Sequence, residues 1–361
     1  MSGDIFHELP IGCLRARNRL VRAATYERLA STDHMVTDEL TELYLRLGAG
    51  GAGSVITSFC CVRPEGHGYS RMLGAYDDSQ VAGLGRLAEA IHEGGALAFL
   101  QLVCCGSGGN PTDDGAPAPG PSTMANPSTG IPMVEMNEGE LRRMRDDFAA
   151  AARRAGEAGF DGVEIHAAHG YLLSQFLSPE LNVRGDAYGR GPLGRARIVC
   201  EVADAVRGRM GEGRPVLVKI NASDGRPGGP AEDESIESAC AIAGHVDGIE
   251  VSGHGWRRAR IAGPRGVHGL FAPYATRLAP LVDVPVILTG ANRDVGEMCE
   301  LVEGGISGFG IARPLVCEPD LPNRWRRDPA YVPRCVSCSR CFSVDGHPCV
   351  LDAPSRPREE A

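Results

Sequence analysis

The chain alternates short apolar runs with longer amphipathic stretches, and this alternation constrains its fold more than any other feature. Continuous apolarity and β-branched residues are typical of strands buried on both faces of a parallel sheet. Eight such runs occur, at Leu20–Ala24, Ser54–Thr57, Ala96–Leu102, Gly162–His166, Val216–Ile220, Gly248–Val251, Val286–Leu288 and Gly308–Ile311. Eight strand–helix units predict a closed (β/α)8 TIM barrel of the α/β class. A doubly wound open sheet is the alternative, because periodicity does not reveal closure.

Helical stretches fill the gaps between the runs. They are Asp38–Leu47, Asp78–Glu93, Gly139–Ala158, Arg195–Met210, Glu232–Gly244, a shorter stretch near Pro273–Val282, and Asp294–Glu303. Asn137 is a plausible N-cap and Gly159 a plausible C-terminal stop for the third stretch. We expect one barrel over residues 1–334. A cysteine-rich extension and tail over 335–361 would not form a separate domain, and we expect disorder after Asp352.

Charge and hydropathy argue against several classes of partner. The formal net charge of −9 gives no reason to expect binding to nucleic acid or to an anionic membrane. No apolar run approaches the roughly 20 residues of a membrane helix. Met1–Pro10 lacks a basic segment followed by an apolar one. We therefore expect a cytoplasmic protein whose 13 cysteines are mostly reduced, buried and structural.

Three long insertions follow predicted strands, at 106–132, 167–194 and 252–269. Barrel enzymes build their active sites from such loops, at the carboxyl ends of the strands. The second insertion begins within the segment VEIHAAHGYLLSQFLSP, in which His166 ends a strand and His169 and Tyr171 follow. Imidazoles that donate hydrogen bonds to a carbonyl oxygen prepare its β-carbon to accept hydride, and a phenol can protonate the neighbouring carbon. The alternative, histidines that only cap the strand, explains the combination less well.

This segment resembles the signature of the Old Yellow Enzyme family, which continues here with Asn182, Arg184, Asp186 and Tyr188-Gly189. The resemblance implies a homo-oligomeric ene-reductase with tightly bound FMN. Hydride would pass from NAD(P)H through flavin N5 to the β-carbon of an α,β-unsaturated carbonyl compound, a small-molecule substrate. His166 and His169 would hold the carbonyl or the nicotinamide amide, and Tyr171 would protonate the α-carbon.

The same resemblance assigns flavin contacts along the chain. The segment 18–27 is similar to the family's first-strand motif, and the residues that would line the flavin are Ala23, Ala24, Thr25 and Tyr26. Gln101 would bond the pyrimidine edge, to which an amide offers a donor and an acceptor. Lys219 would lie near flavin N1 and C2=O, where a cation stabilises negative charge. A purely structural role does not readily explain a lysine inside an apolar strand, because burying an unpaired charge costs free energy.

The cofactor phosphate would lie after the seventh and eighth strands, as in many barrels. The predicted contacts there are Gly290, Ala291, Asn292, Ala312 and Arg313. Gly290 lets backbone N–H groups approach a phosphate, and Arg313 can pair with it. The family usually has two glycines in the first of these turns, where this chain has Gly290-Ala291. The alternative is an ordinary loop with a solvated arginine.

Two departures from the family pattern bear on function. Cys104 stands in place of a histidine and Ser107 in place of an arginine, at positions expected to face the flavin or the substrate. Tyr188-Gly189-Arg190 and Leu193-Gly194 depart in the fourth loop, which suggests a specialised substrate. The alternative function is a flavin-dependent dehydrogenase or isomerase of a biosynthetic pathway in which NAD(P)H is not the reductant. A flavin-binding scaffold without turnover and an aldolase with a Lys219 Schiff base explain the His/His/Tyr set less well.

Four cysteines near the C-terminus form a separate motif, Cys335, Cys338, Cys341 and Cys349. Larger relatives bind a [4Fe–4S] cluster with a similar run. Their spacing is C-x2-C-x3-C and then a longer gap, whereas this chain has C-x2-C-x2-C-x7-C. Three hypotheses stay open: an iron–sulfur cluster, a zinc site, and a set of thiols that binds no metal.

Overall fold

The computed structural model describes residues 4–64, 68–222, 231–253, 268–343 and 349–351. Within them, eight parallel strands form a closed ring in the order β3-β14-β13-β12-β11-β10-β6-β4, and β3 pairs with β4 to complete it. The strands are β3 (Leu20–Arg22), β4 (Ser54–Cys61), β6 (Leu97–Val103), β10 (Gly162–Ala167), β11 (Val216–Asn221), β12 (Gly248–Ser252), β13 (Val286–Thr289) and β14 (Gly308–Ile311). Each predicted run overlaps one of them, so the barrel is confirmed and the open sheet was the wrong alternative.

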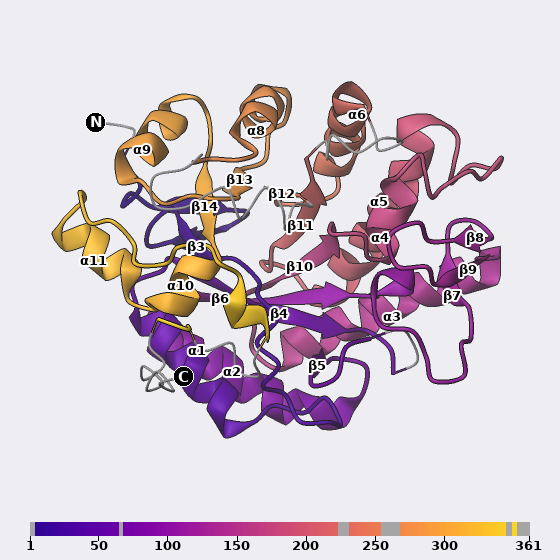
Figure 1. Ribbon diagram of the computed structural model, residues 1–361, viewed down its shortest axis with the longest axis horizontal. Helices are drawn as coiled ribbons and strands as arrows, with labels where there is room; N and C mark the ends of the chain where they lie inside the picture. Colours follow the sequence, from indigo (N-terminus) through magenta and orange to yellow (C-terminus); the bar gives the residue numbers. More distant parts are fainter. Residues whose placement is uncertain (1–3, 65–67, 223–230, 254–267, 344–348, 352–361) are drawn as a thin grey trace, which may run out of the picture.

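Helices surround the ring on its outer side (Figure 1). The longer ones are α1 (Asp38–Ala49), α2 (Val81–Glu93), α3 (Glu138–Glu157), α5 (Gly191–Met210), α6 (Glu232–Ala243), α8 (Ala272–Leu278) and α9 (Val295–Glu303). The shorter ones are α4 (Leu172–Leu177), α10 (Arg313–Cys317) and α11 (Leu321–Arg327), with 3-10 turns η1 (Asp78–Gln80), η2 (Gly106–Gly108), η3 (Ala279–Leu281) and η4 (Arg340–Ser343). Asn137 caps α3 as predicted, and Gly159 follows its end with a φ of 87°.

A hairpin that the sequence analysis did not anticipate closes the amino end of the barrel. It consists of the antiparallel strands β1 (Leu9–Ile11) and β2 (Leu14–Ala16). Its buried side chains pack against residues near the start of the barrel strands, among them Val21, Phe99 and Leu217. This apolar plug seals one end, and the polar residues of the barrel therefore face the opposite end.

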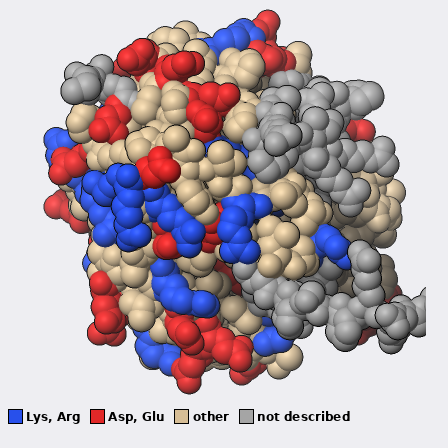
Figure 2. Space-filling view, turned by 60° about the vertical axis from the view of Figure 1, so that its left-hand side comes forward, with Lys and Arg blue, Asp and Glu red and all other residues tan. Residues whose placement is uncertain are grey.

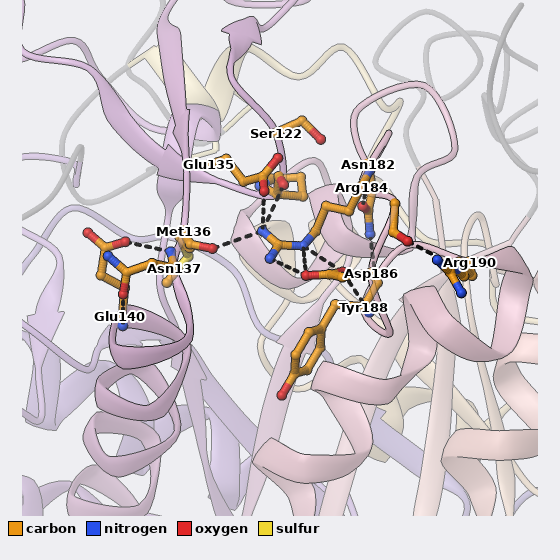
Figure 3. A network of polar contacts seen from close by, with 12 residues as sticks. Ser122, Glu135, Met136, Asn137, Glu140, Asn182, Arg184, Asp186, Tyr188 and Arg190 are labelled. Atoms are coloured by element: carbon orange, nitrogen blue, oxygen red, sulfur yellow. Dashed lines mark hydrogen bonds and ion pairs between the residues drawn. The ribbon is translucent and has the colours of Figure 1, made fainter.

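The insertions after β6 and β10 form one wall above the barrel. The first contains a small sheet of β7 (Ala118–Gly120), β8 (Met124–Ala125) and β9 (Pro132–Glu135). Figure 3 shows how Arg184, from the second insertion, reaches this sheet. Its Nη1 donates to the carbonyl oxygens of Met136 at 2.9 Å and Pro121 at 3.2 Å, and its Nη2 pairs with Asp186 at 2.6 Å. The family-like residues of this segment therefore support the wall.

Two expectations fall on residues outside the described ranges. Most of the third insertion lies in 254–267, and the tail expected to be disordered lies in 352–361. Among the described residues, no helix is long and apolar enough to cross a membrane.

Charge on the surface is balanced locally around α11. The last turn of this helix carries Arg324, Arg326 and Arg327. Arg324 pairs with Asp320 at 2.9 Å and approaches Glu318 at 3.6 Å. Figure 2, which brings this side forward, shows basic side chains bordered by acidic ones. The positive charge of this helix is therefore offset by neighbouring carboxylates.

Candidate functional site

A cavity of about 680 Å³ opens at the carboxyl ends of the barrel strands. Its volume lies in the usual range of small-molecule sites, roughly 300–1,000 Å³. The predicted site residues that line it are Ala24, Thr25, Tyr26, Gln101, His166, His169, Tyr171, Lys219, Gly290, Ala291, Asn292, Ala312 and Arg313. Ala23 is buried and does not belong to the lining. Thirteen of the predicted residues, from six strand ends, thus lie around one cavity, and Ala23 is the exception.

A buried arginine fixes the loop after β3. Arg22 Nη1 donates to the carbonyl oxygen of Ala23 at 2.7 Å and to Thr25 Oγ1, and Nη2 lies 3.3 Å from Glu27 Oε1. Tyr44 also donates to Glu27, at 3.2 Å. Burial raises the pKa of Glu27, and the charge of Arg22 opposes that rise. The hydrogen bond from Arg22 explains why Ala23 does not line the cavity. The carbonyl oxygen of Ala23 accepts from Arg22 and so holds the loop in place, while Ala24, Thr25 and Tyr26 face the cavity.

Two histidines follow β10, and their surroundings orient both rings. The backbone N–H of Ala168 donates to His166 Nδ1 at 3.2 Å, which places the ring proton of neutral His166 on Nε2. His169 has a φ of 60°, a left-handed backbone conformation that is uncommon outside glycine. Asn221 Oδ1 accepts from its backbone N–H at 3.0 Å, and its Nε2 lies 3.0 Å from Ser252 Oγ. Strands β11 and β12 therefore hold a strained residue at the cavity.

Tyr171 lies beside His166 and within an aromatic wall. Its ring centroid is 4.9 Å from that of His166, 5.6 Å from Phe59 and 6.3 Å from Tyr69. Burial raises the pKa of Tyr171 well above its usual value, and Tyr69 and Cys105 add to the effect. The phenol is hydrogen-bonded to Tyr69, whose own hydroxyl donates to the carbonyl oxygen of Gly108 at 2.8 Å. Tyr171 thus keeps its proton at neutral pH and holds a defined orientation.

A row of buried polar side chains lies at the floor of the cavity. Gln101 Nε2 donates to Glu164 Oε2 at 2.5 Å, and Lys219 Nζ pairs with Glu250 Oε1 at 2.6 Å. Lys219 is 2% exposed and Glu250 is fully buried. The argument that the lysine lacked a structural partner was therefore wrong. Glu250 pairs with Lys219, although Lys219 still borders the cavity, as does Gln101.

The turns after β13 and β14 also line the cavity, and there they meet the cysteine-rich extension. Asn292 Nδ2 donates to the carbonyl oxygens of Leu288 at 2.6 Å and Gly310 at 3.1 Å, which ties the two turns together. Ala291 has a φ of 60°, the conformation that would favour the family's second glycine. Gly290, with a φ of 154°, approaches Phe271 so closely that an added Cβ would lie 2.7 Å from the ring.

The extension reaches both arginines of these turns. Arg293 donates to the carbonyl oxygen of Cys335 and to Ser337 Oγ, and Arg313 Nη1 donates to Ser339 Oγ at 3.0 Å. Burial lowers the pKa of Arg313, and the nearby charge of Arg293 lowers it further. Arg313 is therefore half-buried at the border of the cavity, with the extension as a hydrogen-bond partner.

None of the 13 cysteines, all of which lie within the described residues, is paired in a disulfide. Cys335, Cys338, Cys341 and Cys349 lie in the extension, but the described part of the chain contains no group of three or more His, Cys, Asp or Glu side chains arranged to hold a metal ion. Cys104 is buried in the main hydrophobic core and does not line the cavity, so the expectation that it faces flavin or substrate is corrected. Burial raises the pKa of its thiol. A small apolar residue suffices there because β6 turns it toward the helices.

Ser107 is also buried and outside the lining, but it accepts hydrogen bonds from two neighbouring residues. Asn126 Nδ2 donates to its Oγ at 2.9 Å, and Thr129 donates to its carbonyl oxygen at 2.9 Å. Both neighbours line the cavity. Sequence reasoning missed Asn126, Thr129 and Tyr69, which lie in irregular segments without a periodic or motif signal. It also missed Phe342, which follows Cys341 in the short helix η4, because the cysteine motif gave no reason to place its neighbours at the cavity. Their positions depend on contacts with distant parts of the chain.

The arrangement fits a bound FMN. Two buried acceptor atoms on the lining, Gln101 Oε1 and Asn292 Oδ1, have no hydrogen-bond donor among the described residues. Such atoms are costly unless a ligand or water satisfies them. Lys219 and Arg313 line the same cavity and carry positive charge. FMN offers a ring N–H and ribityl hydroxyl groups that could donate to such acceptors, and an electron-accepting ring and a phosphate that such cations would stabilise.

Comparisons with known proteins give consistent matches. A family model described as the NADH:flavin oxidoreductase / NADH oxidase family matches residues 4–329. The chain is 34% identical over 346 residues to a metal reductase of Desulforamulus reducens, covering 93% of this chain and 51% of the relative. It is 30% identical over 384 residues to the 4,4'-dithiodibutanoate disulfide reductase of Rhodococcus erythropolis, covering 96% of this chain and 95% of the relative.

Solved structures agree. A 2-naphthoyl-CoA reductase superposes with a TM-score of 0.83 at 26% identity, covering 91% of this chain and 52% of the other. An old yellow enzyme homologue from Zymomonas mobilis superposes with a TM-score of 0.78 at 25% identity, covering 91% and 94%. The chain thus spans about half the length of the metal reductase and the naphthoyl-CoA reductase, and nearly all of the other two.

Proposed function

The chain belongs to the NADH:flavin oxidoreductase / NADH oxidase family, and from this premise we propose that it is an FMN-dependent ene-reductase. Its substrate would be a small α,β-unsaturated carbonyl compound and its reductant NAD(P)H. The observation that carries the proposal is the convergence of His166, His169 and Tyr171 on one cavity. FMN, when bound, supplies the hydride carrier between the nicotinamide and the alkene. The remaining steps belong to side chains of the protein.

His166 and His169 bind the carbonyl oxygen of the substrate. His166 donates from Nε2, because its Nδ1 accepts from the backbone N–H of Ala168. The ring centroids of the two histidines are 5.0 Å apart with planes at 85°, so two donors from different directions can meet at one oxygen. Donors that are already oriented stabilise the negative charge that develops on that oxygen when its β-carbon accepts hydride.

Tyr171 donates the proton to the α-carbon from its phenol oxygen. Burial raises the pKa of this phenol, which keeps it protonated until the substrate carbon becomes basic. Tyr69 positions the phenol through their hydrogen bond, and Phe59 packs beside both rings. This aromatic wall excludes water from the side of the cavity where the proton is transferred.

Gln101 and Lys219 would hold the ring system of FMN, and Arg313 with the turn at Gly290–Asn292 would hold its phosphate. Gln101 can accept a hydrogen bond at Oε1, because its Nε2 already donates to Glu164. Backbone N–H groups near Gly290 and the guanidinium of Arg313 are typical phosphate partners. The set agrees with the family membership and with the buried acceptors on the lining.

The test is a visible absorption spectrum of protein purified without oxygen, followed by NADPH, NADH and then 2-cyclohexenone. We expect a flavin spectrum that one of the nucleotides bleaches and the enone restores. Bound flavin that neither nucleotide reduces would favour the dehydrogenase or isomerase alternative. A colourless protein that FMN cannot reconstitute would refute the proposal.

One observation favours a second acceptor class. One relative that the chain matches nearly end to end is named a disulfide reductase, of 4,4'-dithiodibutanoate. The same reduced protein can be mixed with that disulfide in parallel with 2-cyclohexenone. Faster reoxidation by the disulfide would make the disulfide bond, and not the activated alkene, the preferred substrate.

A further inference from the structure

Two buried carboxyl groups lie behind the floor of the cavity, and the proposed reaction does not use them directly. Glu164 is on β10 and Glu250 on β12, and Lys219 on β11 lies between them. In the strand register Gln101 is opposite Glu164, and Lys219 is opposite Glu250. Both glutamates are fully buried, so no solvent screens their charges. Gln101 and Lys219 are the members of this row that border the cavity.

The hydrogen bonds of the row leave one carboxyl without a cation. Lys219 Nζ lies 2.6 Å from Glu250 Oε1, so that pair is neutral as a unit. Glu164 Oε2 accepts from the amide of Gln101 at 2.5 Å. The remaining oxygens, Glu164 Oε1 and Glu250 Oε2, are buried and have no donor within hydrogen-bonding distance among the described residues. The hydroxyl of Thr289 lies close enough to Glu250 to lower the pKa of that carboxyl, but Glu164 has no such described neighbour beyond Gln101 and Glu250. The two carboxyls nevertheless lie within hydrogen-bonding reach of each other.

Two ionised carboxylates cannot satisfy this arrangement. Each would be only an acceptor, and a single lysine would face two negative charges in a medium of low polarity. A proton on one oxygen resolves both problems, because the protonated carboxyl donates to the other and the row becomes neutral. Glu164 is the member whose negative charge no cation contacts directly. We propose that Glu164 carries this proton and shares it with Glu250 in a carboxyl–carboxylate hydrogen bond.

The electrostatic surroundings agree with this placement. Burial raises the pKa of Glu164 well above its usual value, and the charge of Glu250 raises it further. Burial would raise the pKa of Glu250 too, but the charge of Lys219 and the hydrogen bonds outweigh burial and lower it. The two carboxyls therefore differ in protonation: Glu164 carries the proton, and Glu250 is the carboxylate that pairs with Lys219.

The shared proton makes Glu164 and Glu250 positioning residues for the cavity. With the proton in place, the row carries no net charge, and Lys219 presents a cation balanced by one carboxylate. Without it, the row would carry one negative charge beneath Gln101 and Lys219. An electron-rich ring on those two residues would then be harder to reduce. This consequence for the flavin rests on the proposed function, whereas the proton itself does not.

The first test reads the proton without any cofactor. We expect the infrared difference spectrum between wild-type apoprotein and Glu164→Gln, at pH 7, to show loss of one carboxylic-acid C=O band. Glu27 is another buried carboxyl with a raised pKa, so the difference between proteins is the readout, and the raw band is not. Glu138→Gln, at a glutamate whose side chain is 82% exposed, is the matched control and should remove no such band. Loss of a carboxylate band in place of the acid band would overturn the proposal.

The second test measures the midpoint potential of the bound flavin. Glutamine reproduces the hydrogen bonds of a protonated Glu164, since its Oε1 accepts from Gln101 and its amide donates to Glu250. Glu164→Gln should therefore leave the potential unchanged. If Glu164 were ionised, the substitution would remove a charge and raise the equilibrium constant for reduction about tenfold or more, about 30 mV for a two-electron couple. That result would overturn the proposal.

A double variant provides the positive control. Glu164→Gln with Glu250→Gln leaves Lys219 without either carboxylate and should raise the potential. Should the double variant fail to fold, the single variant still decides. Should the protein bind no flavin at all, the proposed function fails while the infrared test still decides where the proton is.

Discussion

Tyr171 is the residue from which the proposed chemistry can be tested most directly. In Tyr171→Phe the ring still packs against Phe59 and Tyr69, but the donor of the proton is gone. We expect reduction of the alkene to slow by roughly 10²–10⁴-fold, the usual contribution of a general acid. Reduction of the flavin by NAD(P)H should be unchanged. Stopped-flow absorbance, which separates the two half-reactions, is the measurement.

Tyr69→Phe is the matched control for that prediction. Tyr69 holds the Tyr171 phenol and contributes no proton of its own to the proposed reaction. Its loss should slow alkene reduction less than the loss of Tyr171. Equal effects of the two substitutions would identify the pair, and not Tyr171 alone, as the acid.

The proposed proton on Glu164 also predicts how the free energy of unfolding depends on pH. The folded protein raises the pKa of Glu164 well above that of an unfolded glutamate, about 4.3. The stability that comes from this raised pKa is present below about pH 4.3 and is lost as pH rises toward the folded value. Wild type should therefore lose stability relative to Glu164→Gln by about 1.4 kcal/mol per pH unit in that window. Urea unfolding of both proteins at pH 5, 6 and 7 measures it, and parallel pH curves would contradict it.

The position of a single residue at the cavity was predictable where the residue belonged to a sequence motif. His166, His169 and Tyr171 occur within six positions, and the local segment that carries them also sets their convergence. Lys219 was correctly placed at the cavity but wrongly described as lacking a partner. Its partner, Glu250, is 31 positions away on the next strand, and one sequence contains no signal for such a pairing.

Among the structural elements, the cysteine-rich extension has the least expected role. Ser339 and Phe342 line the cavity, and Ser339 Oγ accepts from Arg313 at 3.0 Å. Ser339→Ala should cost about 1 kcal/mol in the ordering of Arg313 and weaken FMN binding about fivefold. Flavin fluorescence titration of the apoprotein measures this. Val336→Ala, at a side chain exposed to solvent in the same segment, should leave the affinity unchanged.

Elements with long periodic signals were predictable, and short ones were not. All eight barrel strands followed from apolar runs, and Asn137 located the start of α3. The short strands β1, β2 and β8 were missed because each has only two or three residues and none belongs to the repeated alternation of apolar runs and helices that located the barrel strands. The wall that Arg184 ties together could not be predicted either, since it joins residues about 50 to 60 positions apart.

At the scale of the whole molecule, we expect the plug at the amino end of the barrel to contribute to the free energy of unfolding. Ile11 is fully buried there and contacts residues from several barrel strands. Ile11→Ala should lower the free energy of unfolding by roughly 2–5 kcal/mol through lost burial and a cavity. Because the plug lies at the end opposite the site, flavin affinity of the folded protein should not change. Arg15→Ala, exposed in the same hairpin, is the control and should alter stability by less than about 0.5 kcal/mol.

The row of Gln101, Glu164, Lys219 and Glu250 also has an evolutionary consequence. Each member comes from a different strand, yet the row must keep one cation, one anion and one shared proton. A lineage that loses Lys219 is left with an excess carboxylate, and one that loses Glu250 is left with Glu164 as the sole counterion. Substitutions at these positions should therefore be inherited together. In an alignment of relatives, position 219 should covary with 250, and position 164 should alternate between glutamate and glutamine more freely than 250 does.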